Sequence, residues 1–596
     1  MKESLFSFST DKFLGINTDS NITRLKPGES PYMKNFRVND NMSLVKRSGY
    51  KLLHKFNFDV KACFLAKLET ECIFILVEPL VYMCPLPFDV NTMQYIGSVG
   101  THNTRYFFMQ YMGKVYLFGN GKIRYYDTEA QSLKEVEPYR PLIAASCGPY
   151  DLSGTVVEDI NILTGKVRKQ FSPPSPGENK YVVNDSPCQS IDYVKYMGEI
   201  VHPSKYYVAD DNASLLFDNS MAIQAGINTI EIGYTLKDME ENSKKITDCR
   251  YCMFYGGEND TKIFLWGNPD YPDFRFHSQA ADGILGADYF PENNYTKIGD
   301  GSEICDIIRQ YDRQIIFCQN AAYLSYIEEK TDGLGRNYFS FPVRTISDNK
   351  GSCVPGQSKL IDNIPVTLMP DGIYKWISTS QRDERNTVNI SSRINSLLTR
   401  EDIKSAKIFD YEHNGELFIY FPNGRVYVYN YRNDIYYMYD NIFAHTFCSD
   451  IMGNLYFCDM TGGLYIFNDS PSDNGQPIDC EWQSGFYDMG YPGRKNLYNA
   501  SVSVTPRSNT EFMLSWSSDN DADTVKPSRK IRYGALDFGD MNFDMLGFNS
   551  PGEIKNIKIR MRTKRFNYLK LNLKTNSAYS RTNIHRIVLN GKNTNY

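Results

Sequence analysis

The sequence predicts a mainly β protein built on a β-propeller, and three observations carry that prediction. A short pattern recurs along the chain: a glycine, an apolar and aromatic run, a turn rich in Gly or Asn, and a second apolar run. Long amphipathic helical runs are nearly absent. The chain holds 44 Tyr and 35 Phe but only 4 Trp, and Tyr suits a half-buried pleated face. Hairpins repeated over several hundred residues are typical of propeller blades, which bury their faces against each other.

The repeat is visible in five places. The clearest copies span residues 113–127, 415–430 and 453–468, and looser copies span 249–268 and 312–327. Each copy consists of two alternating apolar runs around a turn, which is the signature of a β-hairpin. Two weaker candidates could bring the total to six or seven, so the blade count stays open; they span residues 364–377 and 443–450.

Changes in composition and in hydrophobic pattern divide the 596 residues into five predicted regions. Polar, irregular sequence at the start predicts an extended arm that lies across other domains or subunits, with one short helix beginning at Pro31 behind a Ser30 cap. Pro- and Ser-rich stretches in the middle predict an inserted β domain, and spaced alternating strands near the end predict a β-sandwich-like domain. The regions are the N-terminal arm (1–50), the first propeller part (51–140), the inserted β domain (141–245), the second propeller part (246–470) and the C-terminal β domain (471–596).

Charge and hydropathy argue against two classes of protein. The net charge of −5 argues against a protein that grips nucleic acid through a broad basic surface. The longest basic run, residues 555–565, alternates with apolar residues and is interpreted as a strand with one solvated face. The N-terminus has no continuous apolar stretch, so we expect no signal peptide. The most apolar segment, residues 72–86, is too short and too interrupted to cross a bilayer, so we expect no membrane insertion.

A search for chemistry assigns no catalytic, cofactor-binding or metal-binding residue. The 13 Cys are scattered apart from Cys249 and Cys252, and reduced thiols in a cytoplasm-like environment explain them best. The seven His show no paired spacing, and neither a Gly-x-Ser-x-Gly elbow nor a Walker A loop is present. Residues 519–523 are the best candidate for an ion site, but they lack the glycine and the final Glu of a calcium loop, which favours a solvated loop. We expect the chain not to be an enzyme.

Three blocks of residues carry a resemblance to a known family. The first runs through Gly15-Ile16-Asn17, Leu25-x-x-Gly28-Glu29-Ser30, Met33-x-Asn35-Phe36 and Leu44-x-x-Arg47-x-Gly49-Tyr50. The second is Gly267-Asn268-Pro269, Arg275, Ser278, Asp288-Tyr289-Phe290-Pro291, Asn293 and Gly299, and the third is Gly351-Ser352-Cys353 with Asp371-Gly372-Ile373-Tyr374. In this order they resemble the phage tail nozzle or tail tubular protein B-like proteins, including the DNA-stabilisation type that plugs the channel. The resemblance covers roughly residues 13–467, and residues 141–245 have no counterpart in it.

The resemblance implies a structural virion protein with a β-propeller core. Such a protein would form a ring, with six copies expected, around the conduit for DNA ejection in the phage tail, after assembly in the host cytoplasm. It would dock on a portal-proximal adaptor or tail-tube protein and carry tail fibres or a plug, while genomic DNA passes through its lumen without specific binding. The resemblance brings no catalytic residues and no cofactor. Two alternatives stay open: a receptor- or carbohydrate-binding propeller at the tail tip and, less favoured, a glycan-degrading propeller enzyme whose two carboxylates are placed by the fold.

Overall fold

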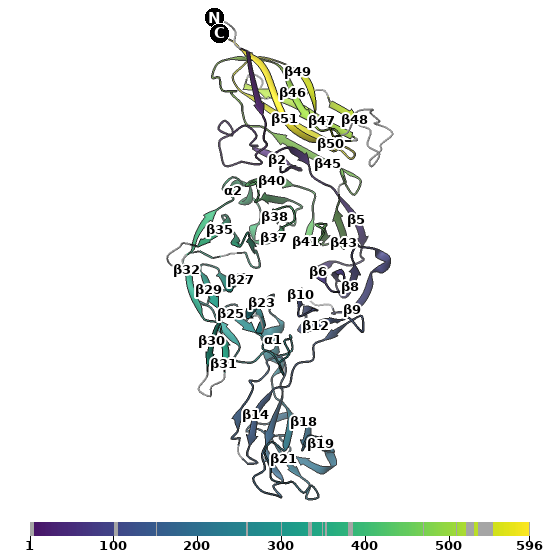
Figure 1. Cartoon of the computed structure of the whole chain (residues 1–596), viewed down its shortest axis with the longest axis vertical. Helices are drawn as coiled ribbons and strands as arrows, with labels where there is room; N and C mark the ends of the chain where they lie inside the picture. The colour runs from purple at the N-terminus through teal and green to yellow at the C-terminus, as the bar shows by residue number, and fades with distance from the viewer. Residues whose placement is uncertain are drawn as a thin grey trace.

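The computed structural model describes residues 5–594 apart from 101–104, 151, 258–259, 300, 332–336, 349, 352–353, 379–384, 469, 508, 520–529 and 535–551. Three bodies lie in a row: a β-sandwich that holds both termini, a propeller ring, and an inserted β domain on the far side of the ring (Figure 1). The mainly β fold with a propeller core is therefore as the sequence predicts. Among the described residues, none of the helices has the length and apolar character that a bilayer crossing needs.

In the described part of the chain the propeller has seven blades of four antiparallel strands; six blades are separate sheets, and the four strands of blade 6 belong to a ten-stranded sheet. The first strands of successive blades contact one another around the centre of the ring (Figure 1). From the centre outward, blade 1 consists of β6 (Val60–Lys67), β7 (Glu71–Val77), β8 (Leu80–Pro85) and β9 (Gln94–Ser98), and blade 2 of β10 (Phe107–Tyr111), β11 (Lys114–Gly119), β12 (Lys122–Asp127) and β13 (Ser132–Glu135). Blade 3 consists of β23 (Tyr251–Gly257), β24 (Asp260–Trp266), β25 (Phe274–His277) and β26 (Tyr295–Lys297), blade 4 of β27 (Ile304–Gln310), β28 (Arg313–Cys318), β29 (Ala322–Tyr326) and β32 (Val343–Ser347), and blade 5 of β33 (Ser358–Ile361), β34 (Ile364–Met369), β35 (Gly372–Ser378) and β36 (Arg385–Asn389). Blade 6 consists of β37 (Lys407–Tyr411), β38 (Glu416–Tyr420), β39 (Val426–Asn430) and β40 (Ile435–Tyr439), and blade 7 of β41 (Ala444–Ser449), β42 (Leu455–Asp459), β43 (Gly463–Phe467) and β5 (Tyr50–Lys55).

Blade 7 closes the ring with a strand from the other end of the propeller sequence. Its fourth strand, β5, precedes blade 1 in the chain and pairs antiparallel with β43, with Tyr50 opposite Phe467. The Tyr50 ring packs edge-on against Phe457 and Tyr465, with centroids 5.1 and 5.4 Å apart. The first and last parts of the propeller sequence are thus held together by one ladder, so the ring cannot open without breaking it.

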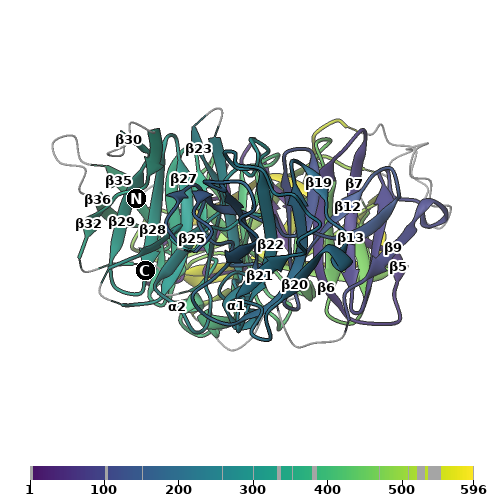
Figure 2. The same ribbon diagram turned by 90° about the horizontal axis from the view of Figure 1, so that it is seen from below.

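The inserted domain leaves the propeller after blade 2 and returns before blade 3. Its described residues form a six-stranded sheet, a three-stranded sheet and a hydrophobic core. The domain projects from the ring in Figure 1 and lies in front of the ring in Figure 2. Its strands are β14 (Leu142–Cys147), β15 (Thr155–Val156), β16 (Lys166–Phe171), β17 (Lys180–Val182), β18 (Cys188–Tyr196), β19 (Glu199–Ile200), β20 (Tyr206–Val208), β21 (Ser214–Phe217) and β22 (Ile230–Leu236). The remaining short elements of the chain are α1 (Glu240–Thr247), α2 (Asn395–Leu398), η1 (Val90–Thr92), η2 (Pro203–Lys205), η3 (Ile403–Ser405) and the hairpin β30 (Glu328–Thr331)–β31 (Asn337–Ser340).

The sandwich combines strands from both ends of the chain. One sheet has the order β3-β4-β51-β46-β49, with β1 also on β51; the other runs β2-β45-β50-β47-β48, and through β2 it joins β40 of blade 6. Propeller and sandwich therefore share a continuous sheet. The strands are β1 (Leu5–Thr10), β2 (Tyr32–Lys34), β3 (Phe36–Val38), β4 (Leu44–Lys46), β44 (Ser472–Asp473), β45 (Gln476–Gln483), β46 (Lys495–Val504), β47 (Asn509–Ser518), β48 (Lys530–Gly534), β49 (Lys555–Phe566), β50 (Leu569–Ser577) and β51 (Asn583–Asn593).

The N-terminal segment is extended, and it docks on the sandwich and the propeller of its own chain. The helix predicted to begin at Pro31 is wrong, because residues 32–34 form strand β2 between β40 and β45. Ser30 donates its hydroxyl to the carbonyls of Gln483 and Tyr32, both at 2.7 Å, instead of capping a helix. Pairing with two distant strands outweighs the local preference. The basic run 555–565 lies in strand β49, as predicted.

Candidate functional site

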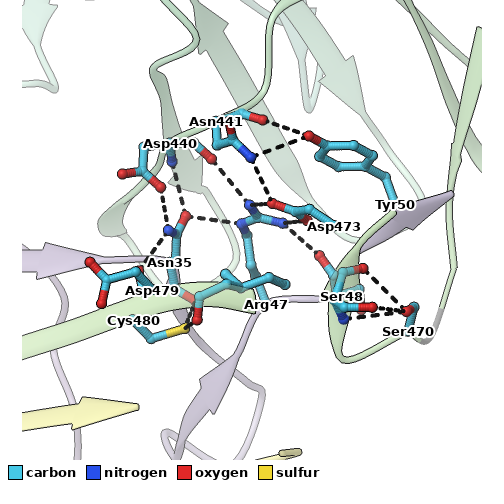
Figure 3. Close-up of polar contacts among 12 residues, drawn as sticks. Asn35, Arg47, Ser48, Tyr50, Asp440, Asn441, Ser470, Asp473, Asp479 and Cys480 are labelled. Atoms are coloured by element: carbon cyan, nitrogen blue, oxygen red, sulfur yellow. Dashed lines mark hydrogen bonds and ion pairs between the residues drawn. The ribbon is translucent and has the colours of Figure 1, made fainter. Parts of the chain in front are cut away.

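The joint between sandwich and propeller is built around Arg47, a residue of the first resembling block (Figure 3). Its side chain is 1% exposed, and all five of its N–H donors have acceptors. Nε donates to Asn35 Oδ1 at 2.9 Å; the two terminal nitrogens donate to the two Asp473 oxygens at 2.8 and 2.6 Å and to the carbonyls of Ser48 and Asp440 at 3.0 and 3.1 Å. Burial opposes the charged form, but the hydrogen bonds and charge of Asp473 outweigh it and raise the pKa of Arg47. The pair is fixed in its ionised, bidentate form.

Asn35 links the same joint to two further segments. Its side-chain oxygen accepts from the Asp440 backbone N–H at 2.9 Å, and its Nδ2 donates to the Asp479 carbonyl at 2.8 Å and to the Asp440 carboxylate. Asp440 follows the outer strand of blade 6, and Asp479 lies in β45 of the sandwich. The Arg47 and Asn35 side chains therefore connect the N-terminal segment, blade 6 and the start of the C-terminal domain in one buried network (Figure 3).

Two glycines of the first block permit close backbone contacts in the same region. A Cβ at Gly28 would lie 1.9 Å from the Lys12 carbonyl oxygen, and its φ of +92° is unfavourable for other residues. A Cβ at Gly49 would lie 1.9 Å from the Ser472 carbonyl oxygen. One hydrophobic core also crosses the joint: Phe13 packs edge-on against Trp482 at 5.3 Å, and the core continues into blades 5 and 6. The first resembling block thus forms a packed, polar-bonded joint.

The second resembling block holds the neck of the inserted domain. Asn161, which is fully buried, donates to the carbonyls of Tyr139 and Asp288 at 2.9 and 2.8 Å and accepts from the Phe290 N–H at 3.1 Å. The Tyr139 N–H in turn donates to the Asp288 carbonyl at 2.9 Å, and Ile162 N–H to the Phe290 carbonyl at 2.9 Å. Residue 139 lies where the chain enters the insert. Residues 288–290 therefore clamp the insert at its root.

Arg275, from the same block, ties blade 3 to blade 4. The side chain is fully buried and donates to the Phe341 carbonyl at 3.2 Å and to the Gln314 side chain. Its guanidinium carbon lies 5.1 Å from the centre of the Phe264 ring. Burial lowers the pKa of Arg275 to about 9. A buried cation held by neutral acceptors and an aromatic ring serves packing between blades.

The remaining residues singled out in the sequence have structural surroundings or lie outside the described residues. The Tyr374 hydroxyl donates to the Asp371 carboxylate at 2.5 Å and closes the β34–β35 turn, whereas residues 352–353 lie outside the described part. Of residues 519–523 only Asp519 is described, and its carboxylate accepts from the backbone of Asn567 and Tyr568. Cys249 and Cys252 carry free thiols. Among the described residues, no three His, Cys, Asp or Glu side chains gather as a metal site.

Sequence reasoning did not single out the partners that complete these joints. Asp440 and Asp473 lie 393 and 426 residues from Arg47, and Asn161 lies 127 residues from Asp288. No local pattern marks such pairs. What the joints can do is mechanical: they fix the sandwich and the insert relative to the ring through hydrogen bonds that are buried or partly buried.

Comparisons with known proteins give the fold context only. No protein-family model matches the chain, and no curated protein matches it. Among solved structures, virginiamycin B lyase from Staphylococcus aureus has 10% sequence identity and a TM-score of 0.35, covering 70% of this chain and 98% of its own. BamB from Moraxella catarrhalis has 8% identity and a TM-score of 0.32, covering 70% of this chain and 97% of its own. At these scores the likenesses carry no argument about function.

Proposed function

We propose that this chain is a structural subunit of a bacteriophage tail or neck, and not an enzyme. It forms a nozzle or hub ring that is part of the DNA-ejection conduit and a docking platform for other tail proteins. The observation that supports this most is the position of the resembling blocks. Residues of the first block build the joint to the sandwich, and residues of the second build the root of the insert. The resembling residues therefore lie at the joints that fix the sandwich and the insert on the propeller. A ring subunit requires such a fixed shape.

The three-body shape suits a subunit with several neighbours. The sandwich and the insert project from opposite sides of the propeller (Figure 1) and offer separate surfaces. On the insert, Tyr207 of β20 and Leu216 of β21 are cross-strand partners, and they are 62% and 47% exposed. Paired apolar side chains that face solvent are a common feature of protein interfaces. In this proposal the rigid propeller braces the ring while the two projecting bodies contact neighbouring subunits and other tail proteins.

Imaging of the purified full-length chain tests the proposal. Light scattering after size exclusion and negative-stain electron microscopy are expected to show a closed ring, with six copies and a central hole wide enough for double-stranded DNA. A discrete monomer or an open trimer under the same conditions contradicts the proposal. If such a monomer also binds oligosaccharides on a glycan array, the receptor- or carbohydrate-binding alternative is favoured.

A double variant locates the contacts. Tyr207→Ser with Leu216→Ser is expected to weaken the ring or its docking to a partner, because it removes apolar area from the insert. The matched control is Ile451→Ser with Met452→Ser on a propeller loop, where both side chains are more than 70% exposed. Equal effects of the two double variants would show that the insert has no special part in assembly.

A further inference from the structure

One sheet of the sandwich has an unusual charge composition. Its six strands, β1, β3, β4, β46, β49 and β51, contain no Asp or Glu. The chain as a whole has 70 acidic and 65 basic residues. The other sheet of the sandwich contains Asp479, Glu481 and Glu511. The basic residues of the acid-free strands are Arg37, Lys46, Lys495, Lys555, Lys558, Arg560, Arg562, Lys564, Arg565, Arg586 and Lys592.

The outer face of this sheet presents a row of cations, which we call the basic ladder: Lys558, Arg560, Arg562 and Lys564. These side chains alternate along β49 with buried residues and are themselves exposed. Successive members stand about 7 Å apart, because two residues of a strand rise by that distance. Among the described residues, no member of the ladder forms an ion pair. Two cations elsewhere on the sheet do form one, Lys555 with Glu553 and Arg586 with Asp11.

Neutral hydrogen-bonding groups flank the ladder on the neighbouring strands. The register sets Arg560 beside Asn499 of β46, which is paired in turn with Asn590 of β51. Tyr498, 42% exposed, also faces this side. Asn499, Tyr498 and Lys592 line a groove of about 970 Å³ together with the ladder, and no described acidic residue lines it. The described lining residues therefore offer cationic and neutral donors without a carboxylate among them.

This set of groups matches the chemistry of a phosphodiester backbone. Phosphate oxygens in nucleic-acid complexes are contacted by Arg, Lys, Asn and Tyr side chains. In its described residues the face carries neither a helix nor a projecting ribbon that could enter a groove and read base edges. The same residues include no row of exposed aromatic rings on which single-stranded bases would stack. The groups therefore favour a duplex, contacted along its backbone.

We propose that the basic ladder binds the phosphate backbone of double-stranded DNA without reading its sequence. The net charge of the chain does not oppose this, since the cations are concentrated on one face and salt screens charges more than about 10 Å away. The biological source of the DNA, the genome in transit, rests on the proposed function. The binding itself does not, because a single subunit carries the whole ladder.

A competing explanation is that the cations only protect an edge. Within the described strands β49 is the last of its sheet, and Lys or Arg on an edge strand discourages pairing with another chain. Edge protection requires no affinity for DNA. The two explanations therefore differ in the affinity for DNA that they predict, which can be measured.

The test measures binding of the full-length chain to a labelled mixed-sequence duplex of about 30 base pairs by fluorescence anisotropy, at several salt concentrations. The ladder variant is Lys558→Gln, Arg560→Gln and Arg562→Gln combined. The matched control is Lys51→Gln, Lys114→Gln and Lys205→Gln combined, which removes the same charge from exposed positions elsewhere. All six side chains are exposed, so both variants are expected to keep the wild-type melting temperature, which circular dichroism checks.

The expected result is that the ladder variant binds the duplex about tenfold or more weakly at low salt, and that its slope of log K against log salt falls by about 3. The control variant should bind within about twofold of wild type.

Equal losses in both variants, no loss in the ladder variant, or no binding by wild type would overturn the proposal. So would aggregation of the ladder variant with unchanged DNA affinity, which supports edge protection. Stronger binding to polyglutamate or to a sulfated polysaccharide than to the duplex would overturn the assignment to DNA. Ring formation is measured separately, so a ring that does not bind DNA refutes only this inference.

Discussion

Removal of Asp473 should destabilise the joint between sandwich and propeller more than any single surface change. Asp473→Ala leaves the buried Arg47 guanidinium with two of its five donors unpaired and its charge uncompensated. Breaking a buried ion pair from one side typically costs about 3–5 kcal/mol. The side chains of both partners are no more than 2% exposed, so bulk water solvates the unpaired guanidinium poorly. We expect a loss of about 3–5 kcal/mol in the free energy of unfolding.

Replacing both partners should cost much less than the sum of the single replacements. In Arg47→Met with Asp473→Leu, neither charge of the pair remains. The losses are the Arg47 hydrogen bonds to Asn35 and to the carbonyls of Ser48 and Asp440, and the long 3.4 Å bond that Asn441 donates to Asp473. Neutral hydrogen bonds of this kind contribute about 1 kcal/mol each. We therefore expect the double variant to lose about 2–3 kcal/mol, and the cycle to give a coupling energy of several kcal/mol.

The assay is denaturant unfolding followed by tryptophan fluorescence. Trp482 and Trp516 report on the sandwich, and Trp266 and Trp376 report on the propeller. Variants that keep only the two sandwich tryptophans or only the two propeller tryptophans report the unfolding of each part by itself. Wild type should show coincident transitions, whereas Asp473→Ala should unfold its sandwich at lower denaturant than its propeller. A loss below about 1 kcal/mol, or additive costs in the double variant, would refute the view that a charged pair holds this joint.

Three further predictions concern other parts of the chain. Gly49→Ala should cost at least about 2 kcal/mol and lower the melting temperature, because the new Cβ would collide with the Ser472 carbonyl, whereas Gly113→Ala meets no neighbouring atom and should cost about 1 kcal/mol for its left-handed backbone alone. Burial lowers the pKa of His277 to about 3, so between pH 7 and 5 the unfolded chain gains a proton at this residue that the folded chain does not. The wild-type free energy of unfolding should therefore fall by about 2 kcal/mol from pH 7 to pH 5 through this group, and that of His277→Phe should not. Denaturant unfolding of both proteins at the two pH values measures the difference. Asn161→Ala should speed hydrogen exchange at residues 139 and 288–290 without changing exchange in the sandwich, and uniform exchange would contradict its role at the neck.

The propeller could be predicted because its signal is local. Five or six mostly apolar residues on each side of a turn specify a hairpin, and the copies at 113–127, 415–430 and 453–468 form the two middle strands of blades 2, 6 and 7. The blade count could not be predicted. The hairpin of blade 1, residues 71–85, turns at Glu78-Pro79 and lacks the glycine pattern, and blade 7 takes a strand from residues 50–55. That strand belongs to blade 7 only through a contact across more than 400 residues.

The joint around Arg47 could be predicted only in part, because its residues also meet across several hundred residues of sequence. The first block drew attention to Asn35, Arg47 and Gly49 through a resemblance, and these residues do meet at the joint. Their partners Asp440 and Asp473 are ordinary acidic residues, and nothing around them in the sequence marks them as partners of Arg47. A buried bidentate pair is a property of tertiary structure, since each side chain on its own would be read as solvated.

The basic ladder shows how a net charge summed over the whole chain can hide a face of one sign. A chain with a net charge of −5 looks unsuited to a polyanion, and residues 555–565 alone look like the solvated side of one strand. The fold changes this reading, because it sets β49 beside strands from residues 495–504 and 583–593, none of which carries an acid. An isolated basic strand would be neutralised by whichever acidic strand became its neighbour. The long-range pairing of this sheet excludes such neighbours among its described strands, so a local run of cations becomes a face of one sign, and a face of one sign is what attracts a polyanion.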